Sequence, residues 1–369
     1  MKVLHFIWSA NFGGIEKLVI NLARQQLLNP HLNVSLLIGN RKGKFLSVIE
    51  NYQLPVEFAD LKTGLDFSLR KYNKVLQLMK AFDIIHIHTF NPVIVQAAIQ
   101  SGKKIIFTVH GNFGFGRKRS IGNFILQRWC GYFIRHYVDY VTYNSEFSQR
   151  YAAKFYRLHS EIKEALIYNA IPENEMKSVK VENHEFPKQE NQFVIGTASR
   201  FAGFKRIDRL IEAFRIFCSN KPDTRLLLVG DGVKMEEYKQ LVSRSGIERH
   251  VTFTGYRENV YSWLNSMDVC VFPSENEPFG IVALEALRLG KPVLVFADGG
   301  GLTEIIRPLN QNNIAGNVAQ LVERLSFYYQ NRTALEDEKS ANSQYAQRFN
   351  ITDMEQAYFK VYSHVLNNS

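Results

Sequence analysis

The chain is poor in cysteine and in long apolar runs. Three cysteines occur in 369 residues, Cys130, Cys218 and Cys270, at spacings that fit neither a disulfide framework nor a metal site. No apolar run approaches the ~20 residues that a helix needs to cross a bilayer. The opening stretch MKVLHFIWSANFGG has too short an apolar part for a signal peptide and predicts a strand. These absences exclude a disulfide-built secreted fold and predict a cytoplasmic protein.

Acidic residues are scarce in the first half. Residues 1–172 hold 22 Lys and Arg against 10 Asp and Glu, whereas residues 193–369 hold 20 of each. No acidic residue occurs between Asp83 and Asp139, so the excess positive charge lies in the first half. This asymmetry predicts an anionic partner there: a membrane surface, a phosphorylated lipid or a nucleic acid.

Short apolar runs alternate with amphipathic stretches along the chain, and this happens twice. Most of the runs lack polar alternation, which is typical of strands buried on both faces of a parallel sheet. The predicted strands are Val3–Ile7, Val34–Ile38, Ile84–His88, Ile105–Val109, Tyr140–Asn144, Ala165–Tyr168, Phe193–Ala198, Leu226–Val229, Val251–Thr254, Val269–Phe272 and Val293–Phe296. The clearest helices are Glu16–Gln26, Arg206–Phe217 and Lys234–Ser245. Alternation of this kind predicts an α/β protein with two Rossmann-like domains.

The domain boundaries follow from a change in composition. Residues 172–192 are polar, contain two prolines and lack apolar periodicity. We therefore predict an N-terminal domain over 1–172, a linker over 173–192 and a C-terminal domain over 193–345. Residues 346–369 form a last segment with an amphipathic helix over about 352–366, expected to return to the N-terminal domain.

Two cations follow the first strand of the second domain. Arg200 and Lys205 stand five residues apart in the segment Ser199–Arg206. The carboxyl ends of strands are where open α/β sheets bind ligands, and a departing diphosphate needs fixed positive charge. A solvated basic loop is the alternative interpretation.

An acidic segment follows the strand Val269–Phe272. It places Glu277 before a helix predicted to start at about Pro278, and Glu285 two turns inside that helix. Helical rise over eight residues would separate the two carboxylates by ~12 Å. The first N–H groups of this helix, on Phe279, Gly280 and Ile281, are predicted to meet phosphate oxygens. Acids that merely cap the helix are the alternative, but the apolar neighbours of Glu285 argue against it.

Two further features are ambiguous by themselves. Gly13-Gly14 ends the first strand where a helix begins, which suits either close approach of a ligand or a tight turn, and it is not a dinucleotide fingerprint. His86, His88 and His110 suggest a metal site, but no nearby carboxylate completes the set. We therefore predict no metal.

Together these motifs resemble the family 4 retaining glycosyltransferases of GT-B fold, over nearly the whole chain. The resemblance is carried by Glu277-x7-Glu285, Arg200-x4-Lys205, Gly230-Asp231-Gly232, Gly13-Gly14-x-Glu16, Thr108-Val109-His110-Gly111 and Gly299–Glu304. It implies two domains with parallel sheets facing across a cleft. The segment after Glu304 is shorter than in the family, which leaves base recognition less defined.

The resemblance also implies roles for individual residues. Arg200 and Lys205 would hold the diphosphate, Glu285 the ribose hydroxyls, and Glu277 the transferred sugar, without acting as a nucleophile. His110 would lie near the sugar. Donor contacts are also implied for Gly14, Gly230, Gly255, Tyr256, Phe279, Gly280 and Ile281. No divalent ion or other cofactor is expected.

The acceptor side is predicted to be basic and aromatic. Arg117, Lys118 and Arg119 form a basic loop before a stretch rich in aromatic residues. We predict that this loop contacts an anionic membrane, while Trp129 and Phe133 belong to the core. No nucleic-acid-binding module is present, so nucleic acid is not an expected partner.

The sequence thus predicts a retaining transferase of the hexosyl or N-acetylhexosaminyl type. It would move a sugar from a nucleotide-diphosphate donor, with UDP expected, to an oligosaccharide or a growing lipid-linked glycan at the inner face of the plasma membrane. Exopolysaccharide, capsule or lipopolysaccharide assembly is the expected setting. The alternatives are a nucleotide-sugar epimerase of the same fold and a catalytically silent scaffold subunit. Intact Glu277, Glu285, Arg200 and Lys205 argue against the silent subunit.

Overall fold

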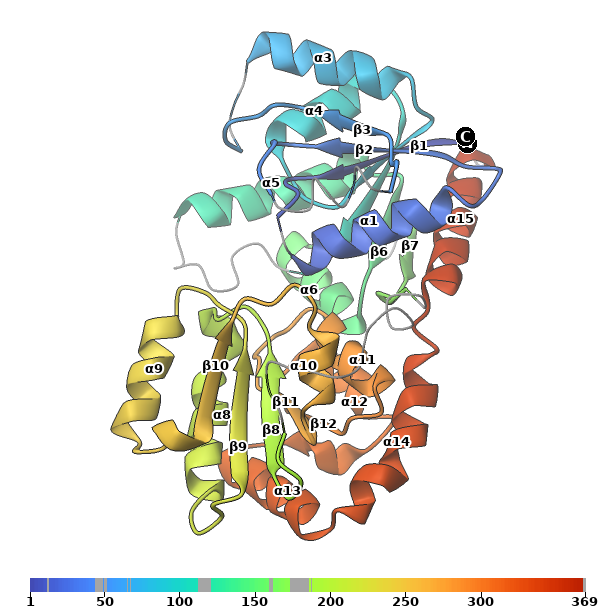
Figure 1. Ribbon diagram of the computed structural model, residues 1–369. Helices are drawn as coiled ribbons and strands as arrows, with labels where there is room; N and C mark the ends of the chain where they lie inside the picture. The colour runs from blue at the N-terminus through green and yellow to red at the C-terminus, as the bar shows by residue number, and fades with distance from the viewer. Residues whose placement is uncertain are drawn as a thin grey trace. The chain divides into compact units, whose positions relative to one another are not determined.

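The computed structural model describes residues 1–369 except 12, 44–48, 50–51, 65, 67, 112–120, 159–161, 173–185, 187 and 368–369. The chain forms two compact units, shown in Figure 1. Of the described residues, the first unit holds 1–111, 121–172 and 350–367, and the second holds 186–349. The last helix therefore belongs with the N-terminal unit.

The first unit is built on a sheet of seven parallel strands in the order β3-β2-β1-β4-β5-β6-β7. The strands are β1 (Lys2–Ile7), β2 (Asn33–Ile38), β3 (Val56–Phe58), β4 (Ile84–Ile87), β5 (Lys104–Val109), β6 (Tyr140–Tyr143) and β7 (Glu164–Leu166). The helices are α1 (Gly14–Gln26), α3 (Leu69–Lys80), α4 (Pro92–Ser101), α5 (Ile121–Tyr137), α6 (Glu146–Tyr156) and α15 (Ile351–Asn367). Parallel pairing requires a crossover between successive strands, which these helices supply.

The second unit repeats this plan with six parallel strands in the order β10-β9-β8-β11-β12-β13. The strands are β8 (Phe193–Ala198), β9 (Thr224–Val229), β10 (Val251–Gly255), β11 (Val269–Phe272), β12 (Val293–Phe296) and β13 (Ile314–Ala315). The α-helices are α8 (Ile207–Phe217), α9 (Met235–Arg244), α10 (Tyr261–Asn265), α11 (Ile281–Arg288), α12 (Gly301–Ile306), α13 (Val318–Gln330) and α14 (Thr333–Ala346). The short 3-10 turns are η1 (Gly203–Lys205), η2 (Glu248–His250) and η3 (Gln311–Asn313).

Both sheets confirm the predicted fold class. The central strands are almost wholly buried, and all six residues of β8 are buried. Strand order reverses between β1 and β4 in one sheet and between β8 and β11 in the other, which is where such folds open a crevice at the carboxyl ends of the strands. The prediction missed only the edge strands β3 and β13, because two or three partly covered residues leave no recognisable apolar run.

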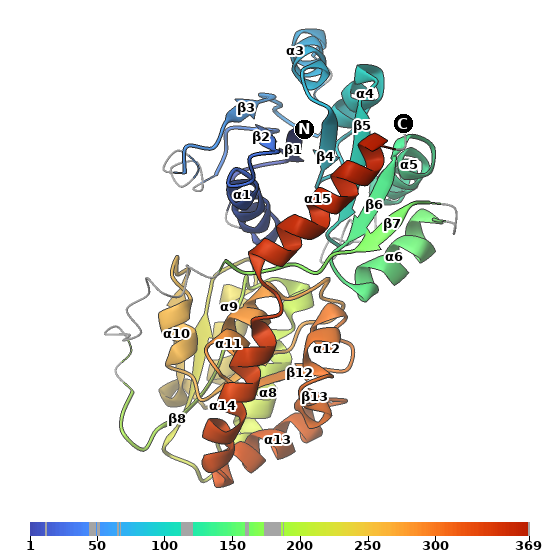
Figure 2. The ribbon, with the colours of Figure 1, turned by 90° about the vertical axis from the view of Figure 1, so that its right-hand side faces the viewer.

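Helix α15 returns to the first unit and packs beside α1, as Figure 2 shows. Its buried face includes the side chains of Tyr358 and Tyr362. Hydrogen bonds tie it to the α1 region: Gln25 Nε2 donates to Thr352 Oγ1 at 3.5 Å, Gln26 Nε2 to the Tyr362 hydroxyl at 3.2 Å, and Asn29 Nδ2 to Glu355 at 3.0 Å. The last residues of the chain thus complete the core of the first unit.

One core assignment on α5 is wrong. Phe133 is buried as predicted, but Trp129 is 39% exposed and touches the core only by an edge-on contact with Phe90. The sequence placed both in the core because both are aromatic. Four residues apart on the helix, they are neighbours, but Trp129 stands at the edge of the buried stripe, which passes through Cys130, Phe133 and Ile134. Among the described residues, no helix combines the length and apolarity needed to traverse a bilayer.

Candidate functional site

The loop that follows β8 carries the two predicted diphosphate cations. Arg200 is exposed and forms no ion pair with any described residue. Lys205 ends the 3-10 turn Gly203–Lys205 and is only 15% exposed. The hydroxyl of Ser199, at the start of the loop, is buried and has no hydrogen-bond partner among the described residues. At the carboxyl end of the sheet, this loop therefore carries a largely buried cation, Lys205, and an exposed cation, Arg200.

Lys205 and Glu277 form the central contact of the site. The Lys205 Nζ and Glu277 Oε2 atoms lie 2.6 Å apart, and the two side chains are 15% and 13% exposed. Lys205 and Glu277 are 72 positions apart in the sequence. They come together because the strands that precede them, β8 and β11, are paired. The backbone strengthens this link, because Glu275 N donates to Phe204 O at 2.9 Å.

A third loop, which follows β12, is hydrogen-bonded to the backbone around Glu277. Gly301 N donates to Glu277 O at 2.7 Å, and Asn276 N donates to Asp298 O at 2.7 Å. Gly300 has φ +64°, and a Cβ there would lie 2.6 Å from Glu277 O. The backbone of residues 276–278 therefore approaches the Gly300–Gly301 pair more closely than a side chain would permit.

The helix beyond Glu277 begins later than predicted. Helix α11 starts at Ile281, and Gly280 precedes it with φ +98°, a left-handed conformation that a helical first turn cannot have. Proline at 278 gave the earlier start, but the chain uses residues 278–280 for the turn against α12. Only residues 281–285 are helical between the two acids, so the 12 Å helical separation does not apply.

Glu285 is the most buried acid of this region. Its side chain is 5% exposed on a helix lined by alanine and leucine, and the Tyr261 hydroxyl donates to Glu285 Oε1 at 3.3 Å. A carboxylate in such surroundings requires hydrogen-bond donors. Phe279, one turn before, is buried and packs edge-on against Phe349, so its side chain is a structural element.

The glycines predicted to cradle the base lie at the ends of β9 and β10. Gly230 N donates to Gly255 O at 3.0 Å, and the two residues have φ values of +132° and +71°. A Cβ on Gly230 would lie 1.9 Å from Ser199 O, which brings the β9 loop against the start of the cation loop. Tyr256 follows and is 45% exposed. The second unit thus gathers Arg200, Lys205, Glu277, Gly230 and Gly255 on loops that touch one another.

Two further predicted site residues, Gly14 and His110, belong to the first unit. Gly14 is the first residue of α1 and is exposed. His110 follows β5 directly, is 8% exposed, and burial lowers its pKa to about 3. His110 Nε2 lies 2.9 Å from His88 Nδ1, while His110 Nδ1 has no hydrogen-bond partner among the described residues. Arg117, Lys118 and Arg119 lie outside the described residues.

A histidine that sequence reasoning missed lies beside this pair. His5 of β1 stands in register with His86 of β4, and its Nδ1 lies 2.9 Å from His88 Nε2. The signal was available in the sequence, since both strands were predicted and a parallel pairing can place His5 beside His86. Nitrogens of His5, His86 and His88 lie within 4.8 Å of one another.

This cluster uses its nitrogens for hydrogen bonds. His5 Nε2 bonds Gln26 Oε1 at 2.8 Å, and His86 bonds the Tyr362 and Thr108 hydroxyls at 2.8 and 2.6 Å. A transition metal would need three of these nitrogens at about 2.1 Å and a further ligand, at the expense of these bonds. Desolvation lowers the pKa of all three imidazoles, so they are neutral. The arrangement is that of a hydrogen-bonded network.

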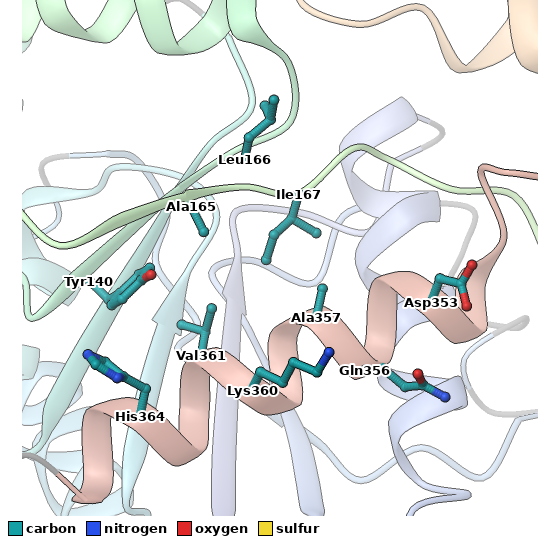
Figure 3. A pocket seen from close by; sticks show the side chains of 10 residues that line it. All are labelled: Tyr140, Ala165, Leu166, Ile167, Asp353, Gln356, Ala357, Lys360, Val361 and His364. Atoms are coloured by element: carbon teal, nitrogen blue, oxygen red, sulfur yellow. The ribbon is translucent and has the colours of Figure 1, made fainter.

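A pocket of about 590 Å³ lies elsewhere in the first unit, between α15 and the strands β6 and β7. Figure 3 shows its lining, in which Asp353, Gln356, Lys360 and His364 project from α15. None of the predicted site residues lines it, and its strand side is the edge of the sheet. The pocket therefore has no part in the site described above.

Solved structures of other proteins share this architecture over nearly the whole length of the chain. HepE from Anabaena, solved with UDP and glucose, superposes with a TM-score of 0.80 over 99% of this chain and all of that chain, at 21% identity. WaaG, a glycosyltransferase involved in lipopolysaccharide biosynthesis, gives 0.71 over 98% and 99% of the two chains, at 17% identity. These similarities define the fold as GT-B.

The sequence comparisons identify the family. The model of Glycosyltransferase Family 4 matches residues 12–175, and the model of Glycosyl transferases group 1 matches residues 179–348. The chain belongs to this family of glycosyltransferases. The O-antigen biosynthesis glycosyltransferase WclY of Escherichia coli is 24% identical over 99% of both chains. N-acetyl-alpha-D-glucosaminyl L-malate synthase of Bacillus anthracis is 30% identical over 61% of this chain and 59% of its own.

Proposed function

We propose that this glycosyltransferase moves a hexosyl or N-acetylhexosaminyl group from a UDP-sugar to a growing, lipid-linked glycan, with retention of anomeric configuration. The observation that carries the proposal is the pair Lys205–Glu277, enclosed by three interlocked loops at the carboxyl end of the second sheet. Such a place supplies a cation for a diphosphate and a carboxylate for sugar hydroxyls within one rigid frame.

The donor is proposed from the site and from the relatives. HepE has been solved with UDP, with UDP and glucose, and with UDP-glucose. The Bacillus anthracis relative is named for an N-acetylglucosaminyl product. In this chain Glu285 would accept hydrogen bonds from the ribose hydroxyls, while Gly230, Gly255 and Tyr256 would bound the base.

The transfer exchanges one bond for another at the anomeric carbon. The bond from that carbon to the diphosphate oxygen breaks with its electron pair going to the phosphate. The acceptor hydroxyl oxygen forms the new bond from the same face, and its proton passes to the departing phosphate oxygen. The products are UDP and the glycan extended by one sugar. Charge develops on the diphosphate, so preorganised cations supply the largest share of catalysis.

Lys205 can serve both partners in this scheme. An ammonium has three N–H donors, and the contact with Glu277 at 2.6 Å uses one of them. Glu277 thereby fixes the ammonium while leaving donors for phosphate oxygens. Arg200 adds a planar guanidinium without a competing carboxylate among the described residues.

We further propose that no divalent ion takes part. Because Arg200 and Lys205 supply two positive charges, the transfer rate should be unchanged after treatment with EDTA and dialysis. A rate that falls on chelation and returns with Mg²⁺ or Mn²⁺ would contradict this.

The acceptor is proposed to be a membrane-bound glycan in surface polysaccharide assembly. WclY is named for O-antigen biosynthesis, and the titles of WaaG and of a third structure, WaaB, refer to lipopolysaccharide synthesis. A lipid-linked substrate would bring the enzyme to the inner face of the plasma membrane as a peripheral protein.

Helix α5 offers a surface suited to that location. The described residues Ile121, Phe124, Ile125, Trp129 and Tyr132 are exposed and recur at intervals of one, three or four residues. This spacing places the first three and Tyr132 along one side of the helix, opposite buried Cys130 and Ile134, with Trp129 at the margin of that side. Arg128 and Arg135 lie on the same helix, which has no acidic residue. An apolar strip with flanking cations is typical of a helix that lies in an anionic lipid surface.

Two measurements test the proposed reaction. First, thermal shift against UDP-, GDP-, ADP- and TDP-sugars should show stabilisation by UDP-sugars, because a ligand that binds only the folded state raises the melting temperature. Second, incubation with the stabilising donor and a lipid-linked acceptor should give UDP and an extended glycan whose new linkage retains the donor's anomeric configuration. Conversion of the donor without any acceptor would instead indicate an epimerase, and absence of both would indicate a silent subunit.

A further inference from the structure

A continuous chain of hydrogen bonds runs beneath the first sheet's carboxyl end. It begins at Gln26 on α1, whose Oε1 lies 2.8 Å from His5 Nε2. His5 Nδ1 lies 2.9 Å from His88 Nε2, and His88 Nδ1 lies 2.9 Å from His110 Nε2. All these side chains are buried, so water does not interrupt the chain.

The amide of Gln26 sets the direction of every bond in this chain. Its Nε2 donates to the Tyr362 hydroxyl at 3.2 Å, so its Oε1 is the atom that faces His5. An amide oxygen only accepts, and His5 must therefore carry its proton on Nε2. A neutral imidazole has one N–H, which leaves His5 Nδ1 as an acceptor.

The same rule passes along the chain. His88 Nε2 must donate to His5 Nδ1, so His88 Nδ1 is an acceptor. His110 Nε2 must then donate to His88 Nδ1, and His110 Nδ1 is left with a lone pair. Burial keeps all three rings neutral, because it lowers the pKa of His5 to about 4, that of His110 to about 3 and that of His88 well below its usual value.

His110 Nδ1 ends the chain without a partner. It is buried and accepts no hydrogen bond from any described residue. An unsatisfied buried polar atom costs about 1–3 kcal/mol, so its persistence calls for a ligand that satisfies it. A nitrogen with a lone pair can accept only from a donor such as a hydroxyl group.

We propose that Gln26 is a positioning residue that, through His5 and His88, fixes His110 as the Nε2–H tautomer, so that His110 Nδ1 accepts a hydrogen bond from a hydroxyl of the transferred sugar. The choice of ligand rests on the proposed function, whereas the tautomer does not. Gln26 is three hydrogen bonds away from His110 and four from the sugar, and it acts only by directing protons.

The second branch of the network anchors Gln26. The Tyr362 hydroxyl, which accepts from Gln26, lies 2.8 Å from His86 Nδ1, and His86 Nε2 lies 2.6 Å from the Thr108 hydroxyl. Thr108 lies 2.6 Å from Thr142 and 3.3 Å from the Tyr358 hydroxyl. Each hydroxyl can both donate and accept a hydrogen bond. The branch is therefore compatible with the orientation of the Gln26 amide and needs no charged group. The α15 helix thus takes part in setting the state of His110.

The tautomer can be measured directly in the intact protein without any ligand. In nitrogen-15 spectra of the imidazole rings, we expect His110 Nδ1 to give the shift of an unprotonated nitrogen and Nε2 that of a protonated one. The reverse assignment in the wild-type protein would overturn the proposal. This measurement needs no variant and no activity.

Variants test the role of Gln26. Gln26→Met keeps an unbranched side chain but removes the acceptor, so His110 should become a mixture of both tautomers. Thr142→Val is the matched control, because it removes a buried hydrogen bond from the other branch and leaves Gln26 Oε1 in place; His110 should keep the Nε2–H tautomer. An unchanged tautomer in Gln26→Met would contradict the proposal. If that variant does not fold, His5→Phe breaks the chain at its next link and serves the same comparison.

Kinetics with deoxygenated donors test the ligand. In the wild type, one monodeoxy UDP-sugar should lose roughly tenfold in kcat/KM, as expected for a hydrogen bond of about 1.4 kcal/mol. In Gln26→Met the same donor should lose less, whereas in Thr142→Val the tenfold loss should remain. Equal losses in all three proteins would remove the sugar from the proposal. Absence of transfer with every donor would instead overturn the proposed function and leave the tautomer result standing.

Discussion

Glu285 is the single residue on which we expect binding of the donor nucleotide to depend. Its carboxylate is 5% exposed among apolar neighbours, and Tyr261 is the donor that the structure places on Oε1. We expect Glu285→Gln to weaken UDP binding by roughly tenfold, because hydrogen bonds to a charged group contribute about 1.5–3 kcal/mol and the amide retains part of this. Isothermal titration calorimetry with UDP measures the change.

The neighbouring acid Glu275 is the control for that substitution. It lies in the same loop as Glu277, but its carboxylate pairs with Arg206 at 3.0 Å and is 36% exposed. Glu275→Gln should leave UDP affinity unchanged. Equal loss in the two variants would mean that the loop, and not the buried carboxylate, determines donor binding.

Lys205 is the residue on which the chemical step should depend most. Lys205→Met removes the ammonium that we propose neutralises the leaving diphosphate, and removal of one such preorganised group lowers kcat by about 10²–10³. Single-turnover transfer measured at saturating UDP-sugar isolates that step. Lys221→Met, beyond the C-terminal end of α8 and bonded to Phe217 O, should retain the wild-type rate. A change in KM with kcat preserved would show that Lys205 only binds the donor.

At the scale of elements, the loops after β8, β11 and β12 behave as one unit. Gly300 combines a φ of +64° with a Cβ position 2.6 Å from Glu277 O. Gly300→Ala should therefore destabilise the protein by more than the ~1 kcal/mol of left-handed strain, and should slow transfer because Glu277 is displaced. Urea unfolding and transfer rate report the two effects.

Gly246 provides the matched substitution for this prediction. Its φ is +65°, but nothing lies within 4 Å of its Cβ position. Gly246→Ala should cost only the backbone strain and leave the transfer rate unchanged. If both variants lost the same stability and kept full activity, the loops would not be interlocked in the manner described.

Helix α5 is the element that should meet the membrane. Phe124 and Ile125 are 62% and 57% exposed, so replacing both with serine should leave the free energy of unfolding within about 0.5 kcal/mol. The same change should weaken binding to vesicles containing anionic lipid, measured by co-sedimentation. Phe327→Ser, on helix α13 of the second unit, should not. Undiminished vesicle binding by the α5 variant would show that this face does not dock.

For the whole molecule, we expect low pH to reduce the free energy of unfolding. His5, His86, His88 and His110 are buried, and their pKa values are lowered by desolvation, to about 4 for His5 and about 3 for His110. Below the unfolded value of about 6.5, the unfolded chain binds protons that the folded chain does not. Stability should therefore be complete above pH 7 and be lost as pH falls from about 6.5 towards 4.

The slope of that loss identifies the groups responsible. Each neutral buried histidine contributes about 1.4 kcal/mol per pH unit inside this window. Urea unfolding at pH 7.5, 6.5, 5.5 and 4.5 should show a steep decline, which becomes shallower in His5→Gln. His31→Gln, at an exposed histidine, should follow the wild type. A flat profile down to pH 5 would contradict a neutral buried cluster.

Much of the second unit could be predicted because its motifs are local. Arg200 and Lys205 occupy one short loop at the end of β8, and an apolar run marks that strand unmistakably. The start of α11 was misplaced, because proline permits a helix start, whereas Gly280 is left-handed and leaves no room for a Cβ beside Leu302 of helix α12. Trp129 was misplaced for a related reason: which side of α5 faces the sheet depends on packing with α6.

The sequence alone determined the two parallel sheets, the family and the residues that stand at the ends of the strands. These depend on short-range patterns: apolar runs, glycines and charges at fixed spacing. Only the tertiary structure decided that Lys205 meets Glu277 across 72 residues, and that Gln26, His5 and His88 lead to His110. Hydrogen bonds have direction, and their direction becomes defined only when strand register and the return of α15 bring distant donors and acceptors together.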